Sequence, residues 1–345
     1  LIFKQASGTS RGVLTTKETY LLEISENNKK GIGECAIFRG LSYDDVPDYE
    51  EKLTWLCKNI NLDFEVLKKE LLHYPSIIFG LEQALLNLEH GEDLYFPSDF
   101  TDGKDSIKIN GLIWMGNADF MQSQIEEKLA KGFDCIKLKI GVDWKSEKEI
   151  IKKLREKFPK EQLELRVDAN GAFSYEEARM VLQELADLGI HSIEQPIKKS
   201  EVRSPKSEEN SEKKSTDCCV PWNEMAKLCA ETPTPIALDE ELIGVIDFEE
   251  KKKLLETIKP QYIILKPALV GGFSGSDEWI VLAESLGIDW WITSALESNI
   301  GLNAICQYTY TKKNPLPQGL GTGALFTNNF ETHLQLEGDQ MWHKK

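Results

Sequence analysis

The sequence lacks the features that mark several large classes of protein. No apolar run reaches the roughly 18 residues that a membrane-spanning helix needs, and the first residues lack the apolar core of a signal peptide. The seven cysteines form no CxxC pair, so we expect no zinc site but reduced thiols in a cytoplasmic protein. The 57 acidic residues outnumber the 41 Lys and Arg residues. A net charge of −16 argues against non-specific binding to nucleic acid or to an anionic membrane, and the short apolar runs argue against membrane insertion.

What is present is a chain of 345 residues with 41% hydrophobic residues, enough for a large core. Residues 1–104 predict an α+β capping domain. A strand pattern covers 19–24, a returning strand begins at residue 31, and three helical patterns follow. We expect the last segment, 326–345, to pack back on this capping domain.

From residue 105 to 325 short β-rich runs alternate with helical patterns, which predicts a (β/α)8 barrel of the TIM type. The alternative is an open doubly wound sheet, which is weaker because no GxGxxG opens a helix. The predicted strands are eight: 107–114, 135–140, 163–169, 191–197, 236–241, 262–268, 289–294 and 318–322.

One segment interrupts this alternation. Residues 198–217 are almost free of apolar side chains and mix both charges, so they cannot contribute to a core. We expect a disordered insertion without a catalytic part. Because it follows the fourth barrel strand at the face where active sites lie, a lid or a partner contact is the alternative.

The second predicted strand carries two lysines, Lys137 and Lys139, two residues apart. Alternate side chains of a strand point to the same side, so both ammonium groups would face one space. Neighbouring cations repel, which lowers the pKa and makes a lysine usable as a base near neutral pH. Taken alone, a KxK pattern more commonly marks a strand with a solvated edge.

Carboxylates end the next three predicted strands: Asp168, Glu194 and Asp239. In a barrel these strand ends converge on one opening, where three carboxylates repel unless a cation lies between them. Oxygen ligands without a nearby Cys or His favour Mg²⁺, with Mn²⁺ as a substitute. Asn170 and Glu240 are candidate supporting residues, and a turn or capping role explains them equally well.

Lys266 ends the sixth predicted strand, so it and Lys139 would flank the metal from opposite sides. Lysines beside a metal that occupies the carboxylates should have depressed pKa values. The chemistry that suits this set is removal of a proton α to a carboxylate, with Mg²⁺ stabilising the developing enediolate. The alternative from another class is a scaffold that keeps the fold without activity.

In order and in type, these motifs (KLK, DAN, EQP, DE and a lone Lys) resemble the enolase superfamily, and the lysines resemble its muconate-lactonizing-enzyme subgroup. The resemblance covers nearly the whole chain and implies a modified barrel with a capping domain. It implies that Asp168, Glu194 and Asp239 hold Mg²⁺, that Lys139 is the acid and base, and that Lys266 lies across the substrate. Lys137 would keep Lys139 deprotonated.

Within the subgroup, six segments are similar to those of a dehydratase: 8–14, 33–42, 110–116, 237–244, 265–273 and 294–303. N-acylamino acid racemase and dipeptide epimerase remain alternatives. The epimerases of the family carry a DxD motif on the eighth strand, where this chain has Gly319-Leu-Gly-Thr-Gly323. An α-ammonium group would have no counter-charge there, which argues against a dipeptide.

The expected partner is a small carboxylate substrate, and the sequence leaves a monomer and a homo-oligomer both open. Predicted substrate-binding residues lie near the barrel opening. Ser294, Ser298 and the backbone near Gly301 could bind a carboxylate, and Arg11 and Phe38 could cover the site. Ordinary hydrogen bonding at a strand end explains the serines equally well.

Overall fold

The protein is described by a computed structural model that covers residues 1–9, 12–114, 116–200 and 222–344. Its centre is a parallel sheet of seven strands in the order β12-β11-β10-β9-β8-β7-β6. The strands are β6 (Gly111–Ile113), β7 (Cys135–Lys139), β8 (Glu164–Asp168), β9 (Ser192–Glu194), β10 (Ile236–Leu238), β11 (Tyr262–Leu265) and β12 (Asp289–Ile292).

The eighth predicted strand is reduced to two single parallel bridges, which connect the two edges of the sheet. Gln318 bridges Ile109, and Gly319 bridges Thr293. The short extent has a local cause, because Pro315 and Pro317 just before the bridges have no N–H to donate. The curled sheet is therefore the barrel that the alternating pattern predicts, with a minimal eighth segment.

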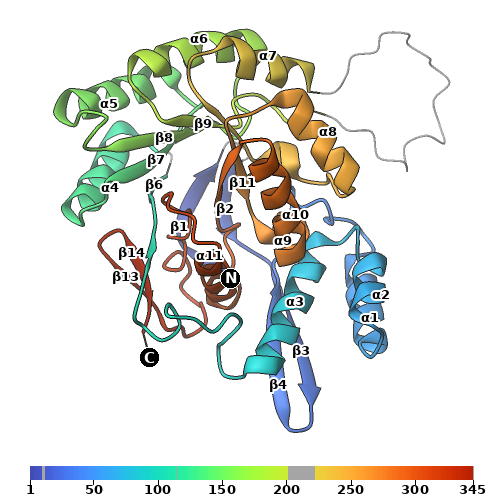
Figure 1. Ribbon diagram of the computed structural model, residues 1–345. Helices are drawn as coiled ribbons and strands as arrows, with labels where there is room; N and C mark the ends of the chain where they lie inside the picture. Colours follow the sequence, from blue (N-terminus) through green and yellow to red (C-terminus); the bar gives the residue numbers. More distant parts are fainter. Residues whose placement is uncertain (10–11, 115, 201–221, 345) are drawn as a thin grey trace, which may run out of the picture.

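Helices connect the strands and cover the outside of the sheet, as Figure 1 shows. Two of them begin with side-chain caps: Asp247 accepts from the first turn of α8, and Ser174 forms a reciprocal capping box with Glu177 in α6. The barrel helices are α4 (Ala118–Ala130), α5 (Trp144–Lys157), α6 (Tyr175–Asp187), α7 (Asn223–Glu231), α8 (Phe248–Ile258), α9 (Pro267–Val270), α10 (Gly272–Ser285) and α11 (Asn299–Thr311), with a 3-10 turn at Glu240–Leu242.

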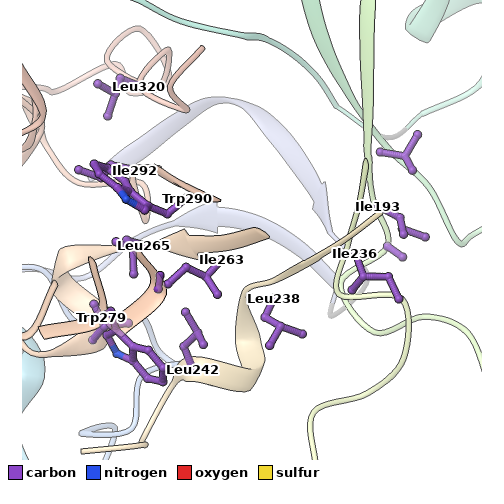
Figure 2. Close-up of a cluster of buried hydrophobic side chains, with 14 of the residues drawn as sticks. Ile193, Ile236, Leu238, Leu242, Ile263, Leu265, Trp279, Trp290, Ile292 and Leu320 are labelled. Carbon is purple, nitrogen blue, oxygen red and sulfur yellow. The ribbon is translucent and has the colours of Figure 1, made fainter. Parts of the chain in front are cut away.

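The barrel core consists of apolar side chains from the strands and the inner faces of these helices. Ile193, Leu238 and Ile263 come from neighbouring strands and Trp279 from α10, all in one cluster (Figure 2). All four are buried. Their burial fixes which face of each strand looks inward, and this sets the direction of the polar residues at the strand ends.

The N-terminal part contains two antiparallel hairpins, and the second of them, residues 20–35, packs on helices at the side of the molecule away from α4 and α5 (Figure 1). Gly31 and Gly33 allow β4 to lie against α3, since a Cβ at Gly33 would sit 1.9 Å from the carbonyl oxygen of Gly80. The elements are β1 (Ile2–Thr9), β2 (Gly12–Thr16), β3 (Tyr20–Glu26), β4 (Lys29–Cys35), α1 (Tyr49–Asn59), α2 (Phe64–Glu70) and α3 (Pro75–His90).

The C-terminal hairpin, β13 (Leu334–Glu337) and β14 (Gln340–His343), pairs through β14 with β5 (Ile107–Lys108). His343 also contacts Asp93, with 3.2 Å between Nε2 and Oδ2. The domain boundaries at 104/105 and 325/326 stay predictions. Most of the polar insertion, from residue 201 on, lies outside the described residues. No helix in the described ranges is long and apolar enough to cross a membrane.

Candidate active site

One row of charged side chains crosses three neighbouring barrel strands at their carboxyl ends. Lys139 of β7 lies opposite Asp168 of β8, and Asp168 lies opposite Glu194 of β9. Partners in one row of a sheet project to the same side. All three are buried, with Lys139 the most exposed at 9%. Sheet register therefore brings together groups that are up to 55 residues apart in the chain.

Two further strand ends extend this row. Asp239 directly follows β10 and Lys266 directly follows β11. Lys266 Nζ donates to Asp239 Oδ2 and lies 3.8 Å from Glu194 Oε1. The strand order therefore puts Lys139 and Lys266 at opposite ends of the three carboxylates.

Lys137 and Lys139 meet on the same carboxylate, as strand alternation predicts. Lys139 Nζ donates to Asp168 Oδ2 at 2.9 Å, and Lys137 Nζ lies 3.4 Å from that oxygen. Lys137 donates its main hydrogen bond to Glu194 Oε2 at 2.6 Å. Neither lysine is a solvated strand edge, because both side chains are at least 89% buried.

The pKa values of the charged groups in the row are shifted in different directions. Burial raises the pKa of Asp168, but the charges of Lys139 and Lys137 outweigh it and hold that pKa below its usual range. Burial and the neighbouring Asp168 charge raise the pKa of Glu194. Burial alone would lower the pKa of Lys266, and the charges of Asp239 and Glu194 raise it above its ordinary value. The depressed pKa predicted for Lys266 is thus absent while its ammonium group pairs with the carboxylates.

The three carboxylates suit a hard divalent cation by the type of their donors, which are all oxygens. Glu194 Oε1 is buried and has no hydrogen-bond partner among the described residues, so it has a free lone pair for a ligand. With the side chains as they lie, no three His, Cys, Asp or Glu residues in the described ranges are placed so that they could hold a metal ion together. The lysine ammonium groups hold the carboxylate oxygens, and they would have to withdraw for a cation to bind.

Asn170 and Glu240 continue a chain of hydrogen bonds that starts at Lys139. Lys139 Nζ donates to Asn170 Oδ1 at 2.7 Å, and Asn170 Nδ2 donates to Glu240 Oε1 at 3.1 Å. Asn170 has a φ of 44°, an uncommon conformation for a residue other than glycine. Such strained positions concentrate at functional sites, and here the strain turns the amide toward Lys139.

A cavity with about 740 Å³ of space outside protein atoms, its opening included, adjoins this row. Lys137, Lys139, Asp168, Asn170 and Lys266 line one part of it. The remainder is lined by residues from the capping loop and from the first, seventh and eighth barrel segments: Phe38, Leu41, Asn110, Leu112, Trp114, Thr293, Ser294, Ala295, Leu296, Gly319, Gly321 and Thr322.

Some of the predicted substrate-binding residues line the cavity and others do not. Phe38 and Ser294 line the cavity. Ser298 and Gly301 do not, and both donate to Glu34 of β4: Ser298 Oγ at 2.6 Å and Gly301 N at 2.9 Å. Their proposed binding of a substrate carboxylate stays a prediction that requires Glu34 to give way. Arg11 lies outside the described residues.

Glu34 is a residue that the sequence pattern did not single out. It is fully buried, and it accepts hydrogen bonds from Thr19 Oγ1 at 2.8 Å and from the start of α11. The signal available in the sequence was a charged residue between Gly33 and Cys35, at the end of the returning strand. A buried carboxylate needs donors, and the first turn of a helix supplies them.

A buried lysine–carboxylate row at the carboxyl ends of barrel strands, under a capping domain, defines a class of protein. The family model "Enolase C-terminal domain-like" matches residues 121–207. An o-succinylbenzoate synthase of Desulfotalea psychrophila is 42% identical over 98% of this chain and 95% of its own length. The chain belongs to the enolase superfamily. Members of this superfamily generally depend on a divalent metal ion.

Among solved structures, MenC from Desulfotalea psychrophila LSv54 has a TM-score of 0.83 and 39% identity over 99% of this chain and 97% of its own. A dipeptide epimerase from Enterococcus faecalis, solved with Mg and L-Leu-L-Tyr, has a TM-score of 0.79 over 99% of this chain and 93% of its own. At 20% identity that second likeness concerns the fold alone. The fold class predicted from the sequence, a modified barrel with an α+β capping domain, is confirmed.

Proposed function

We propose that the protein is an o-succinylbenzoate synthase. It would dehydrate 2-succinyl-6-hydroxy-2,4-cyclohexadiene-1-carboxylate to o-succinylbenzoate in menaquinone biosynthesis. The observation that carries this proposal is the placement of Lys139 and Lys266 at the two ends of the carboxylate row, beside a largely apolar cavity. The 42% identity to an o-succinylbenzoate synthase supports it. A small carboxylate substrate and a cytoplasmic location belong to the same proposal.

Asp168, Glu194 and Asp239 are the proposed metal ligands, for Mg²⁺ with Mn²⁺ as a substitute. When bound, the cation stabilises the negative charge that develops on the carboxylate of the substrate. Lys137, which donates to Glu194, holds one ligand in place and adds positive charge beside Lys139.

Lys139 is the proposed acid and base. Its Nζ, in the neutral form, takes the proton from the ring carbon that carries the carboxylate, and Asn170 Oδ1 orients it for this transfer. The same ammonium then gives its proton to the departing hydroxyl on the same face, so water leaves and the ring becomes aromatic. Lys266 keeps its charge and faces the anionic ring from the other end of the row.

Apolar side chains beside the row serve this chemistry by excluding water. Phe38 and Leu41 reach the cavity from the capping loop, and Leu112 and Trp114 from the first barrel strand. A low-dielectric surrounding strengthens the attraction between the lysines and a negatively charged ring. Aromatisation supplies driving force, so positioning is the main task left to the protein.

The second candidate is racemisation of N-acylamino acids, which uses a lysine on each side of the α carbon. The two-ended arrangement of Lys139 and Lys266 favours it as well. An N-succinylamino acid racemase of Thermus thermophilus is 33% identical over 51% of this chain. Dipeptide epimerisation is less favoured, because residues 319–323 contain no carboxylate for an α-ammonium group.

The deciding experiment measures turnover of the cyclohexadiene substrate and of N-succinylamino acids in parallel, in the presence of Mg²⁺. We expect dehydration to dominate and to stop when EDTA removes the metal, with recovery on adding Mg²⁺ or Mn²⁺. Exchange of the α proton with deuterium reports racemase chemistry separately. Absence of dehydration by metal-loaded protein would overturn the proposal.

A further inference from the structure

A second cavity lies beside the catalytic cavity, which is the one that adjoins the charged row. It has about 1,270 Å³ of space outside protein atoms, its opening included. Leu41 and Asn170 line both cavities, so the two adjoin at these residues. Gly40, Val142 and Lys198 line the second cavity and are exposed, so it opens to solvent. The second cavity therefore lies between solvent and the charged row on this side of the site.

Positive charge is in excess on the lining of this second cavity. Lys198 and Lys199 line it, together with one carboxylate among the described residues, Glu240. The neighbouring Glu241 is buried, is absent from the lining, and accepts a hydrogen bond from Ser200 N at 3.1 Å. The whole chain carries a net charge of −16, so at long range it repels an anionic ligand. A local excess of positive charge therefore has most effect where such a ligand enters.

Contacts on two sides hold the segment that carries the two lysines. On one side, Lys199 Nζ donates to the carbonyl oxygen of Ile243, which follows β10. On the other side, Gly171 allows a close approach, because a Cβ there would lie 2.9 Å from the Cα of Lys198. Burial lowers the pKa of Lys199, and the charge of Glu241 partly offsets this effect. The backbone of both lysines is thus fixed at the rim of the second cavity.

We propose that the second cavity is the entrance for the anionic substrate, where Lys198 and Lys199 attract its carboxylates and raise the rate of binding. The inference rests on the proposed function, which supplies a substrate with two carboxylates, and deepens it by assigning the path of entry. Attraction of this kind raises association rates by about tenfold or more and is screened by salt. Neither lysine lines the catalytic cavity, so both act on the approaching ligand and not on the bound one.

The test follows the binding of o-succinylbenzoate in the presence of Mg²⁺ by stopped-flow tryptophan fluorescence, since Trp114 lines the catalytic cavity. In Lys198→Glu the association rate constant should fall by at least about fivefold at low salt, because attraction at the entrance becomes repulsion. The dissociation rate constant should change by less than about twofold, as is typical of a charge at a rim. At about 1 M salt, where the Debye length is about 3 Å, the association rate constants of variant and wild type should agree within about twofold.

Further variants separate the charge at this position from the side chain and from the charge of the whole protein. Lys198→Arg keeps the charge and should keep the association rate constant within about twofold. Lys198→Gln removes one unit of charge and should give a rate constant between those of the wild type and Lys198→Glu. The control combines Lys152→Gln with Lys153→Gln, which lowers the net charge by the same two units on the exposed face of α5. Its association rate constant should stay within about twofold of the wild type.

Equal association rate constants for Lys198→Glu and the α5 control would overturn the entrance, as would a loss of affinity carried by faster dissociation alone. The two proposals fail separately, because binding of the product requires no turnover. Slower association in Lys198→Glu without dehydration by the wild type keeps the entrance and loses the function. If o-succinylbenzoate does not bind, N-succinylphenylalanine, a ligand of the second candidate function, takes its place, and absence of binding by both acids overturns the entrance as well.

Discussion

At the scale of single residues, the site is a set of buried charges that neutralise one another. Lys137 and Lys139 share Asp168, while Lys266 pairs with Asp239. Buried ions of this kind are held only with close partners, because their desolvation is expensive. Removing one lysine therefore changes both the chemistry and the charge balance, and a test of its role needs a readout specific to proton transfer.

Lys139→Ala should lower kcat/KM for dehydration by at least about 1,000-fold, since general acid–base catalysis commonly contributes two to four orders of magnitude. Exchange of the α proton with deuterium should fall by a similar factor. Lys131→Ala, an exposed lysine at the end of α4 paired with Glu127, is the matched control and should keep both rates within about twofold. Exchange that persists in Lys139→Ala would remove this residue as the base.

At the scale of elements, a side chain of helix α3 in the capping region caps the start of a barrel helix. Glu82 of α3 is 7% exposed and accepts from Phe273 N at 2.5 Å and from Ser274 N at 3.1 Å, in the first turn of α10. These donors are the unpaired N–H groups of a helix start, which favour a negative charge. Burial opposes them and prevails, so the pKa of Glu82 is raised to about 7.

A pH-dependent stability follows for this contact. Folded Glu82 keeps its proton up to about pH 7, whereas the unfolded chain loses it near pH 4.5, so folding is favoured at low pH and this contribution is lost as pH rises through 7. Between pH 5.5 and 7.5 the loss is about 2 kcal/mol. Urea unfolding of Glu82→Gln should show a smaller decrease in stability over this range than the wild type. Parallel pH profiles of the two proteins would contradict the assignment.

At the scale of the whole molecule, Glu34 joins the capping hairpin to the barrel. Its carboxylate accepts from Ser298 N at 2.9 Å and Gly301 N at 2.9 Å, so β4 caps the start of α11 beside the cavity. Lys17 is buried nearby, where burial lowers its pKa and the charges of Glu34 and Glu297 partly offset that effect. The two parts of the chain are thus connected by buried polar contacts as well as by apolar packing.

Glu34→Ala should destabilise the protein by about 3–5 kcal/mol, because it leaves the buried donors of Ser298 and Gly301 without an acceptor and removes one of the two negative charges near buried Lys17. The change is measured as a lowered thermal midpoint. Glu23→Ala removes a carboxylate of the same hairpin, half exposed and paired with Lys30, and should cost less than about 1 kcal/mol. A similar midpoint for the two variants would show that Glu34 is not a joint between the domains.

The sequence by itself determined the barrel class and the identity of the charged row. Strand alternation and the position of polar residues after apolar runs are local properties, so Lys139, Asp168, Glu194, Asp239 and Lys266 could be selected without a structure. Only the tertiary structure decided which groups are partners. Glu34 and Ser298 are 264 residues apart, and Asn110 meets the eighth segment across 208 residues. Hydrogen bonds at such separations depend on packing in three dimensions, which no local pattern in the chain encodes.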